Sequence, residues 1–187
     1  MLRLVLASAS PRRAELLTAA GFSFDVAPEE VDETPYTGEP PEVYALRVAR
    51  DKAAAAFARR ADSAILAADT VVIVDSNNLG KPRDAADAAR MLRLLSGATH
   101  EVQTAVILRT KANETSHVEK TRVHFRPLTP EEVDWYVSTG EPEGKAGAYA
   151  IQGRAARFID WIEGSWSNVV GLPVAVVYRL LKEAGVT

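Results

Sequence analysis

The feature that most constrains the fold of this chain is a short apolar run that leads directly into a helical pattern near the N-terminus. Residues 4–7 read Leu-Val-Leu-Ala, which is typical of a buried strand, and apolar side chains recur at helical spacing over residues 14–20. Between them, Ser10 suits the N-cap and Pro11 the first helical position, and Gly21 suits the C-terminal end. The pattern therefore predicts a strand followed by a helix, a building block of α/β folds.

Hydroxyl and guanidinium groups surround the expected start of this helix. Ser8, Ser10, Arg12 and Arg13 lie in or beside its first turn, where unpaired backbone N–H groups favour anions. Two cations at this position oppose the helix dipole, and a bound anion would remove that conflict. The alternative is a capped helix with two solvated arginines, and these residues alone leave both interpretations open.

The rest of the chain alternates between strand and helix patterns. Strands are expected at residues 22–26, 65–74, 99–108, 116–125 and 157–162, and helices at residues 42–60, 85–96, 130–139 and 174–184. Because strands and helices interleave, and because two long strands follow one another directly, we expect an α/β fold with a mixed sheet. No repeat, low-complexity tract or linker divides the chain, so residues 1–187 are expected to form a single domain.

The expected helix at residues 42–60 has an apolar stripe and a charged remainder. The apolar residues near one face are Val43, Leu46, Ala49, Ala53 and Phe57. The charged residues off this stripe are Arg47, Arg50, Asp51 and Lys52. A solvated, charged face accounts for most of them.

Asp69 is the second informative position, because it lies inside a doubled apolar run. Residues 65–68 and 71–74 are wholly apolar, and only Asp69 and Thr70 interrupt them. A carboxylate is costly to bury unless it is paired, hydrogen-bonded or bound to a metal ion. The alternative is a strand end or a bulge that returns Asp69 to water.

Composition excludes several classes of function. The net charge of −3 argues against nucleic acid as the main partner, since the chain has no surplus of basic residues. The absence of cysteine excludes disulfides, a thiol nucleophile and cysteine-based metal sites. No apolar run is long enough to span a membrane, and residues 1–3 lead into a strand without the features of a signal peptide. We therefore expect a cytoplasmic protein.

Several common catalytic and nucleotide-binding motifs are also missing. The Gly80-Lys81 pair lacks the rest of a Walker A pattern, and neither a Gly-x-Gly-x-x-Gly after the first strand nor a Gly-x-Ser-x-Gly elbow occurs. The histidines are His100, His117 and His124. They have no metal-ligand or triad residues nearby in the sequence, and we expect them to be ordinary strand residues.

Phosphate-binding cations and hard oxygen ligands remain. Lys52 and Lys81 can join the basic groups at the start of the first helix. Asp69 and the Asp32-Glu33 pair offer carboxylates of the kind that Mg²⁺ or Mn²⁺ takes, together with substrate phosphates and water. This combination is compatible with metal-assisted attack of water on a phosphoanhydride, although it does not require it.

A series of motifs, in order along the chain, resembles the Maf family of nucleoside triphosphate pyrophosphatases. They are Ser8 to Arg13, Val31 to Glu33, Arg50 to Ala53, Ala68 to Val72, Gly80 to Pro82, Lys145 to Tyr149, Ile151 to Gly153 and Asn168 to Pro173. Together they cover essentially the whole chain. One departure is Ala155, where the family pattern Ile-Gln-Gly-x-Gly has a glycine.

The resemblance implies hydrolysis between the α- and β-phosphates of a nucleoside triphosphate, with a divalent metal, Mg²⁺ or Mn²⁺. The products are a nucleoside monophosphate and pyrophosphate. It also implies a fold like that of inosine triphosphatases, a mixed twisted sheet flanked by helices, with two lobes and the nucleotide in a central cleft. The family commonly forms homodimers.

The resemblance also implies a role for each matching residue. Asp69 matches the family's proton acceptor and Glu33 a metal-binding or catalytic acid, and both are candidate metal ligands. The positions that match polyphosphate-binding groups are Ser8, Arg13, Lys52 and Lys81. The positions associated with base choice, in the branch that prefers dTTP and UTP, are Arg12, Thr70 and Gln152.

Gln152 favours the dTTP/UTP branch, since the sister branch, similar to 7-methyl-GTP pyrophosphatases, tends to have glutamate there. A glutamine both donates and accepts at a pyrimidine edge, whereas a carboxylate only accepts and favours a cationic base. The leading hypothesis is a dTTP/UTP pyrophosphatase that also acts on modified pyrimidine triphosphates. The alternatives are a 7-methyl-GTP pyrophosphatase and a nucleotide-binding regulator of septum formation. Glu33 and Asp69 favour an enzyme, because a mere binder would gain little from acids beside phosphates.

Overall fold

The structure is a computed structural model, and it describes residues 2–186. Within these residues, seven strands form a sheet in the order β2 (Asp25–Val26), β1 (Arg3–Leu6), β3 (Ser63–Val74), β5 (Thr99–Arg109), β6 (Glu114–Phe125) and β7 (Ile159–Glu163), with β4 (Asn77–Leu79) paired to β3. β1 pairs in parallel with β2 and β3, whereas the β3–β4 and β6–β7 pairs are antiparallel. The prediction of an α/β fold with a mixed sheet is confirmed.

The chain forms two compact units that each combine distant segments. The first unit comprises residues 2–69, 104–119 and 171–186, and the second comprises residues 70–103 and 120–170. The long strands β3, β5 and β6 therefore each contribute one end to each unit.

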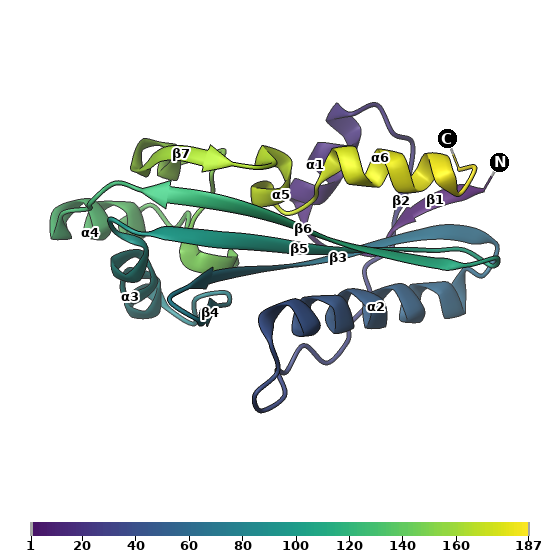
Figure 1. Ribbon diagram of the computed structural model, residues 1–187, viewed down its shortest axis with the longest axis horizontal. Coiled ribbons are helices and arrows are strands. Elements are labelled where there is room, and N and C mark those ends of the chain that lie inside the picture. The colour runs from purple at the N-terminus through teal and green to yellow at the C-terminus, as the bar shows by residue number, and fades with distance from the viewer. Residues whose placement is uncertain (1, 187) are drawn as a thin grey trace. The chain divides into compact units, whose positions relative to one another are not determined.

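In the first unit, helices cover both faces of the sheet (Figure 1). α1 (Pro11–Ala19) and α6 (Val174–Glu183) lie on one face, and α2 (Pro41–Arg59) lies on the other. Leu6, Leu66 and Leu108 of the strands join Val177 and Leu181 of α6 in a buried apolar core. Because successive strand residues point to opposite faces, the residues next to Leu6 in β1 and next to Leu66 in β3 face α2.

α1 begins and ends where the sequence predicts. Ser10 is the N-cap residue and a proline occupies the first turn, although the Ser10 side chain makes no capping hydrogen bond. At the other end Gly21 has a φ of 79°, and the N–H groups of Gly21 and Phe22 donate to the carbonyls of Thr18 and Leu17. This pair of bonds is the Schellman motif, which requires a left-handed residue and so favours glycine.

The buried face of α2 differs from the predicted apolar stripe. The buried residues of the helix are Ala45, Val48, Ala49, Ala53 and Ala56. Val43, which the sequence placed on the stripe, is 52% exposed. Small side chains let a helix lie close to a sheet, so alanines mark the buried face better than larger apolar residues do. Lys52 lies three residues after Ala49 and four before Ala56, and it therefore belongs to the buried face.

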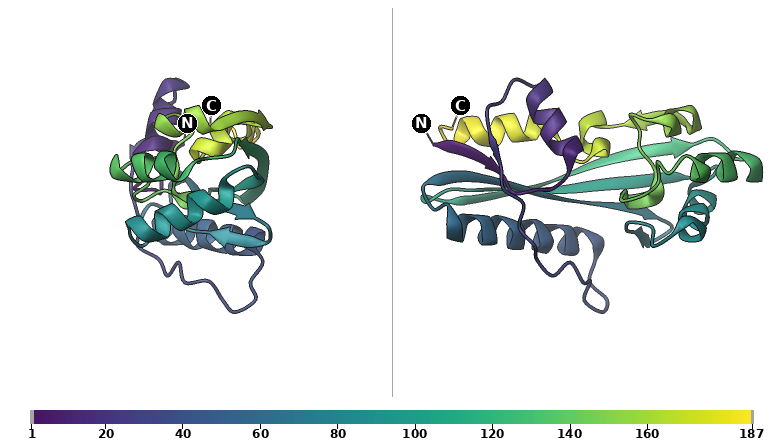
Figure 2. Two further views of the ribbon diagram at one scale, coloured as in Figure 1. Left: turned by 90° about the vertical axis from the view of Figure 1, so that its left-hand side faces the viewer. Right: turned by 180° about the vertical axis from the view of Figure 1, so that it is seen from behind.

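In the second unit, α3 (Ala85–Leu95) packs against α4 (Pro130–Ser138) and against the short 3-10 turn η1 (Ala146–Ala148) (Figure 2). Both helix starts follow the sequence. Asp84 accepts a hydrogen bond from the Asp87 N–H at α3, and Thr129 and Glu132 form a capping box at α4. The unit also contains α5 (Trp166–Val170). No helix within residues 2–186 has the length and apolar content needed to cross a membrane.

Two strands are shorter than the sequence predicts. The strand expected at residues 22–26 is reduced to Asp25 and Val26 of β2, and the strand expected at residues 157–162 begins only at Ile159. Residues before Ile159 form the 3-10 turn η2 (Arg154–Phe158). A strand exists only where a partner strand pairs with it, and the local apolar pattern does not contain that information.

Candidate active site

Three charged side chains of the first unit form a compact cluster. Lys52 Nζ lies 2.7 Å from Glu33 Oε1 and 2.9 Å from Asp69 Oδ1. The side chains of Lys52 and Asp69 are only 11% and 12% exposed, whereas that of Glu33 is 40% exposed. A single ammonium group therefore holds two carboxylates side by side, and the Glu33 edge of the cluster is open to solvent.

Asp69 belongs to β3, which runs without interruption from Ser63 to Val74, and it is buried. The alternative of a strand end or a bulge that returns Asp69 to water is therefore wrong. Asp69 follows Ile65 and Ala67 on alternate positions of the strand, which face α2. Lys52 approaches from that same side and offsets the cost of burying the carboxylate.

The two adjacent acidic residues before α2 have different environments. Glu33 turns its carboxylate to Lys52. Asp32 is exposed and accepts a hydrogen bond from the Thr34 N–H at 2.9 Å. Hydrogen bonding from Thr34 lowers the pKa of Asp32 below its usual value. The structure thus brings Glu33, and not Asp32, to the cluster.

Arg13 is a buried cation of the first unit. Its Nε donates to the carbonyl of Gly171 at 2.8 Å, and its Nη1 donates to the hydroxyl of the buried Ser8 at 3.1 Å. Burial lowers the pKa of Arg13 from its usual value, and the negative charge of Asp69 opposes that shift. The interpretation of two solvated arginines is therefore wrong for Arg13. Arg12, in contrast, is partly exposed.

The other three predicted site residues belong to the second unit. Thr70 directly follows Asp69 in β3, so the two side chains point to opposite faces of the sheet. Lys81 lies just after β4, Gln152 lies in the turn before η2, and both are exposed. Lys81 and Gln152 therefore stand on solvent-facing turns, where a ligand can reach them.

Two of the sequence motifs meet in this unit. The Gly147 N–H donates to the Gly80 carbonyl at 3.1 Å, which ties the segment of Lys81 to the segment of Lys145. Gly147 has a φ of 70°, and a Cβ added there would lie 3.0–3.2 Å from the side chain of Val72. Both the backbone conformation and the close contact favour glycine.

The turn that carries Gln152 is built around the carboxylate of Glu141, which sequence reasoning missed. Glu141 accepts hydrogen bonds from the Tyr136 hydroxyl at 2.8 Å and from the Arg154 N–H at 3.1 Å. A Cβ added at Gly153 would lie 2.5 Å from a Glu141 carboxylate oxygen. Since a carboxylate that binds backbone 13 residues away has no local signature, the sequence offers no signal for it.

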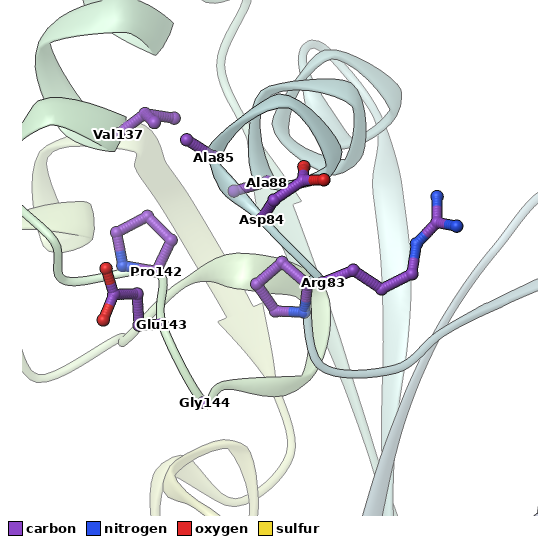
Figure 3. Close-up of a pocket in the computed structure, with 9 residues that line it drawn as sticks. Arg83, Asp84, Ala85, Ala88, Val137, Pro142, Glu143 and Gly144 are labelled. Atoms are coloured by element: carbon purple, nitrogen blue, oxygen red, sulfur yellow. The ribbon is translucent and has the colours of Figure 1, made fainter.

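A pocket of about 310 Å³ lies in the second unit (Figure 3). It is lined by residues 82–85, Ala88, Val137 and residues 142–144. Figure 3 shows residues of the 142–144 turn across from residues at the start of α3. Residues 82 and 144 directly neighbour Lys81 and Lys145 in the chain, so a concavity of small-molecule size adjoins the segments of both lysines, although neither lysine lines it.

The expectation for the histidines is confirmed, since all of them lie in strands. His100 is in β5, and His117 and His124 are in β6. His100 Nε2 lies 2.8 Å from the Tyr149 hydroxyl, and burial lowers the pKa of His100 to about 3. His100 is therefore a neutral residue of the core at physiological pH.

Glu33 and Asp69 have the chemistry to hold a divalent cation. Their carboxylates converge on one ammonium group, which shows that a positive charge is accommodated between them. Mg²⁺ usually takes one or two carboxylates and completes its shell with water and substrate phosphates. No group of three or more His, Asp or Glu side chains suited to a metal occurs in the described part of the chain. The donors thus fit a cation shared with a phosphate ligand.

Comparison with known proteins relates nearly the whole chain to one family. A sequence model described as "Maf-like protein" matches residues 3–184. The chain is 51% identical to a dTTP/UTP pyrophosphatase of Koribacter versatilis, over 98% of this chain and 95% of that protein. It is 47% identical to a dTTP/UTP pyrophosphatase of Bacillus cytotoxicus, over 98% of this chain and 96% of that protein.

The fold also has a counterpart among solved structures. A HAM1 protein from Coxiella burnetii matches with a TM-score of 0.53 and 15% identity, over 98% of this chain and 100% of that chain. At this identity the likeness shows the fold alone.

Proposed function

Since the chain belongs to the family of Maf-like proteins, we propose that it hydrolyses dTTP and UTP to the nucleoside monophosphate and pyrophosphate. The observation that carries this proposal is the nearly full-length match to relatives named dTTP/UTP pyrophosphatase, at 47% to 51% identity. The charged cluster of Glu33, Lys52 and Asp69 supports an enzyme over a nucleotide-binding regulator. On their own, carboxylates repel phosphates, so a protein that only binds nucleotides gains little from them.

In this proposal, Asp69 accepts a proton from the water that attacks the α-phosphorus. The bond from that phosphorus to the oxygen bridging to the β-phosphate breaks, and pyrophosphate leaves with the electron pair. Glu33 and Asp69 would hold Mg²⁺ or Mn²⁺. The bound cation would neutralise phosphate charge and make the water more acidic. Lys52, already within 3 Å of both carboxylates, adds a fixed positive charge for the phosphates.

The remaining residues bind the substrate in this proposal. Ser8 and Arg13 bind phosphate at the start of α1, where the two side chains are already oriented by their own hydrogen bond. Lys81 provides a further charge from the second unit. The residues that select the base are Arg12, Thr70 and Gln152. We also propose that the two units are lobes of a single domain, and that the enzyme is a cytoplasmic homodimer.

A nucleotide screen tests the proposal. Purified protein is incubated with single nucleoside triphosphates, Mg²⁺ or Mn²⁺, and inorganic pyrophosphatase, and the released phosphate is measured. We expect dTTP and UTP to be the best substrates. When the nucleoside monophosphate is measured directly, without the metal-dependent coupling enzyme, we expect activity to be lost when a chelator removes the divalent cation. A clear preference for 7-methyl-GTP would instead place the protein in the sister branch, and no hydrolysis of any triphosphate would support the regulator.

The variant Gln152→Glu is expected to change substrate preference. The ratio of kcat/KM for dTTP to kcat/KM for 7-methyl-GTP should fall by roughly ten- to a hundredfold, because a carboxylate cannot donate a hydrogen bond to a pyrimidine edge. Asn78→Asp, a similar change at an exposed position of strand β4 in the same unit, is the control. An unchanged ratio in Gln152→Glu would mean that Gln152 does not contact the base.

A further inference from the structure

Tyr44 contacts the residue that carries one of the two clustered carboxylates. Its hydroxyl donates a hydrogen bond to the Glu33 carbonyl at 3.0 Å. Tyr44 lies in α2, eight residues before Lys52, so the two residues are separated by about two turns of the same helix. The backbone of Glu33 is thus tied to the same helix that supplies the ammonium group for its side chain.

Arg47 holds the loop that follows Glu33. Its Nη2 donates to the Thr34 carbonyl at 3.0 Å, and its Nε and Nη2 donate to the Glu39 carboxylate at 2.7 and 2.8 Å. Its guanidinium also lies 4.1 Å from the centre of the Tyr36 ring. The guanidinium of Arg47 therefore holds the loop both at Thr34 and at Glu39. This keeps the loop ordered next to Glu33, where the Tyr44 hydroxyl binds.

The Tyr44 hydroxyl experiences the negative charge of both clustered carboxylates. Burial, followed by the negative charges of Asp69 and Glu33, raises the pKa of Tyr44 to about 12. The neutral phenol is the form that donates a hydrogen bond to the Glu33 carbonyl.

We propose that Tyr44 is a positioning residue of the hydrolytic site, which keeps Glu33 beside Lys52 and Asp69 through its bond to the Glu33 carbonyl. The inference rests on the proposed function of the cluster. Glu33 needs such support because it lies on a loop, and its side chain is 40% exposed, unlike those of its two partners. An acid on an unsupported loop would spend much of its time away from the phosphates that it serves.

The variant Tyr44→Phe tests this inference, because it keeps the ring and removes only the hydroxyl. We expect kcat for dTTP to fall about five- to tenfold, the usual effect of losing one neutral hydrogen bond, with little change in KM. Tyr178→Phe is the matched control, because Tyr178 is an exposed tyrosine of α6 outside the cluster. Thermal unfolding of both variants shows whether stability has changed.

A double-mutant cycle with Glu33→Gln distinguishes positioning from a general structural role. If Tyr44 acts through Glu33, then Tyr44→Phe lowers kcat less than twofold in the Glu33→Gln background. If the Glu33→Gln enzyme is too slow for steady-state assays, single-turnover measurements with excess enzyme supply the rates, with the same expectation. A full five- to tenfold loss in that background would overturn the inference, as would wild-type kcat in Tyr44→Phe alone.

The design separates failure of this inference from failure of the proposed function. If the wild-type protein and Tyr178→Phe hydrolyse dTTP and Tyr44→Phe matches them, only the role of Tyr44 is wrong. If the wild-type protein hydrolyses no triphosphate, the proposed function is wrong, and the assignment of Tyr44 to a hydrolytic site falls with it.

Discussion

The variant Asp69→Asn is expected to lower kcat for dTTP by about a thousandfold, within the range for losing a positioned proton acceptor. Asparagine has nearly the same shape, and its carbonyl oxygen can still accept a hydrogen bond from Lys52 Nζ, which lies 2.9 Å from Asp69 Oδ1. Its amide cannot take up a proton at neutral pH and is a poorer ligand for a divalent cation. The chemical step should therefore suffer far more than nucleotide binding.

The measurement compares turnover with binding of a non-hydrolysable triphosphate analogue. We expect the dissociation constant of the analogue to stay within a few-fold of the wild-type value while kcat collapses. Asp32→Asn is the matched control, since Asp32 is an exposed carboxylate one residue from Glu33 and lies outside the cluster. Wild-type turnover in Asp69→Asn would show that Asp69 takes no part in the reaction. An equal loss in Asp32→Asn would show that the effect comes from removing any negative charge near the cluster.

The need of Asp69 for a charged partner is visible in the sequence because its signal is local. A carboxylate within an apolar strand pattern requires a partner, and the structure supplies one in Lys52. The bounds of α1 are predictable for the same reason, since Pro11 in its first turn and Gly21 after its last turn act on their own immediate backbone. Features that depend on a few neighbouring residues can therefore be read from the chain alone.

The partner itself could not be predicted. The helical pattern places Lys52 off the apolar stripe of α2, and Lys52 is expected at the site only as one of the phosphate-binding cations. The true buried face consists mostly of alanines, and it is set by how closely the helix approaches the sheet. That distance is a property of tertiary packing, which overrides the local pattern.

Long-range hydrogen bonds are the second class of feature that the sequence conceals. The bonds from Tyr44 to the Glu33 carbonyl and from the Arg154 N–H to Glu141 join residues 11 and 13 positions apart. In each case one partner is a backbone group, which carries no residue-specific signal. The residues that support the loop of Glu33 and the turn of Gln152 therefore became apparent only in the structure.

The variant Lys52→Met is expected to lower kcat/KM for dTTP by roughly a hundredfold. Methionine fills much of the space of the lysine stem, so packing on the buried face of α2 is largely kept. The fixed positive charge is lost, and each such charge aimed at developing negative charge contributes about 2–4 kcal/mol to the transition state. The loss also leaves Glu33 and Asp69 next to one another without the ammonium group that now lies within 3 Å of both.

The stability of Lys52→Met provides a second measurement. Uncompensated repulsion between two partly buried carboxylates should lower the melting temperature. Added Mn²⁺ should raise the melting temperature more in the variant than in the wild type.

Arg50→Met is the matched control for activity. Arg50 pairs with Glu114 at the exposed side of the same helix, and its replacement should change activity less than twofold. If Lys52→Met kept wild-type kcat/KM, Lys52 would be a structural counter-ion for the two acids and would have no part in binding phosphate. Equal losses in the two variants would point to a general effect of charge on α2.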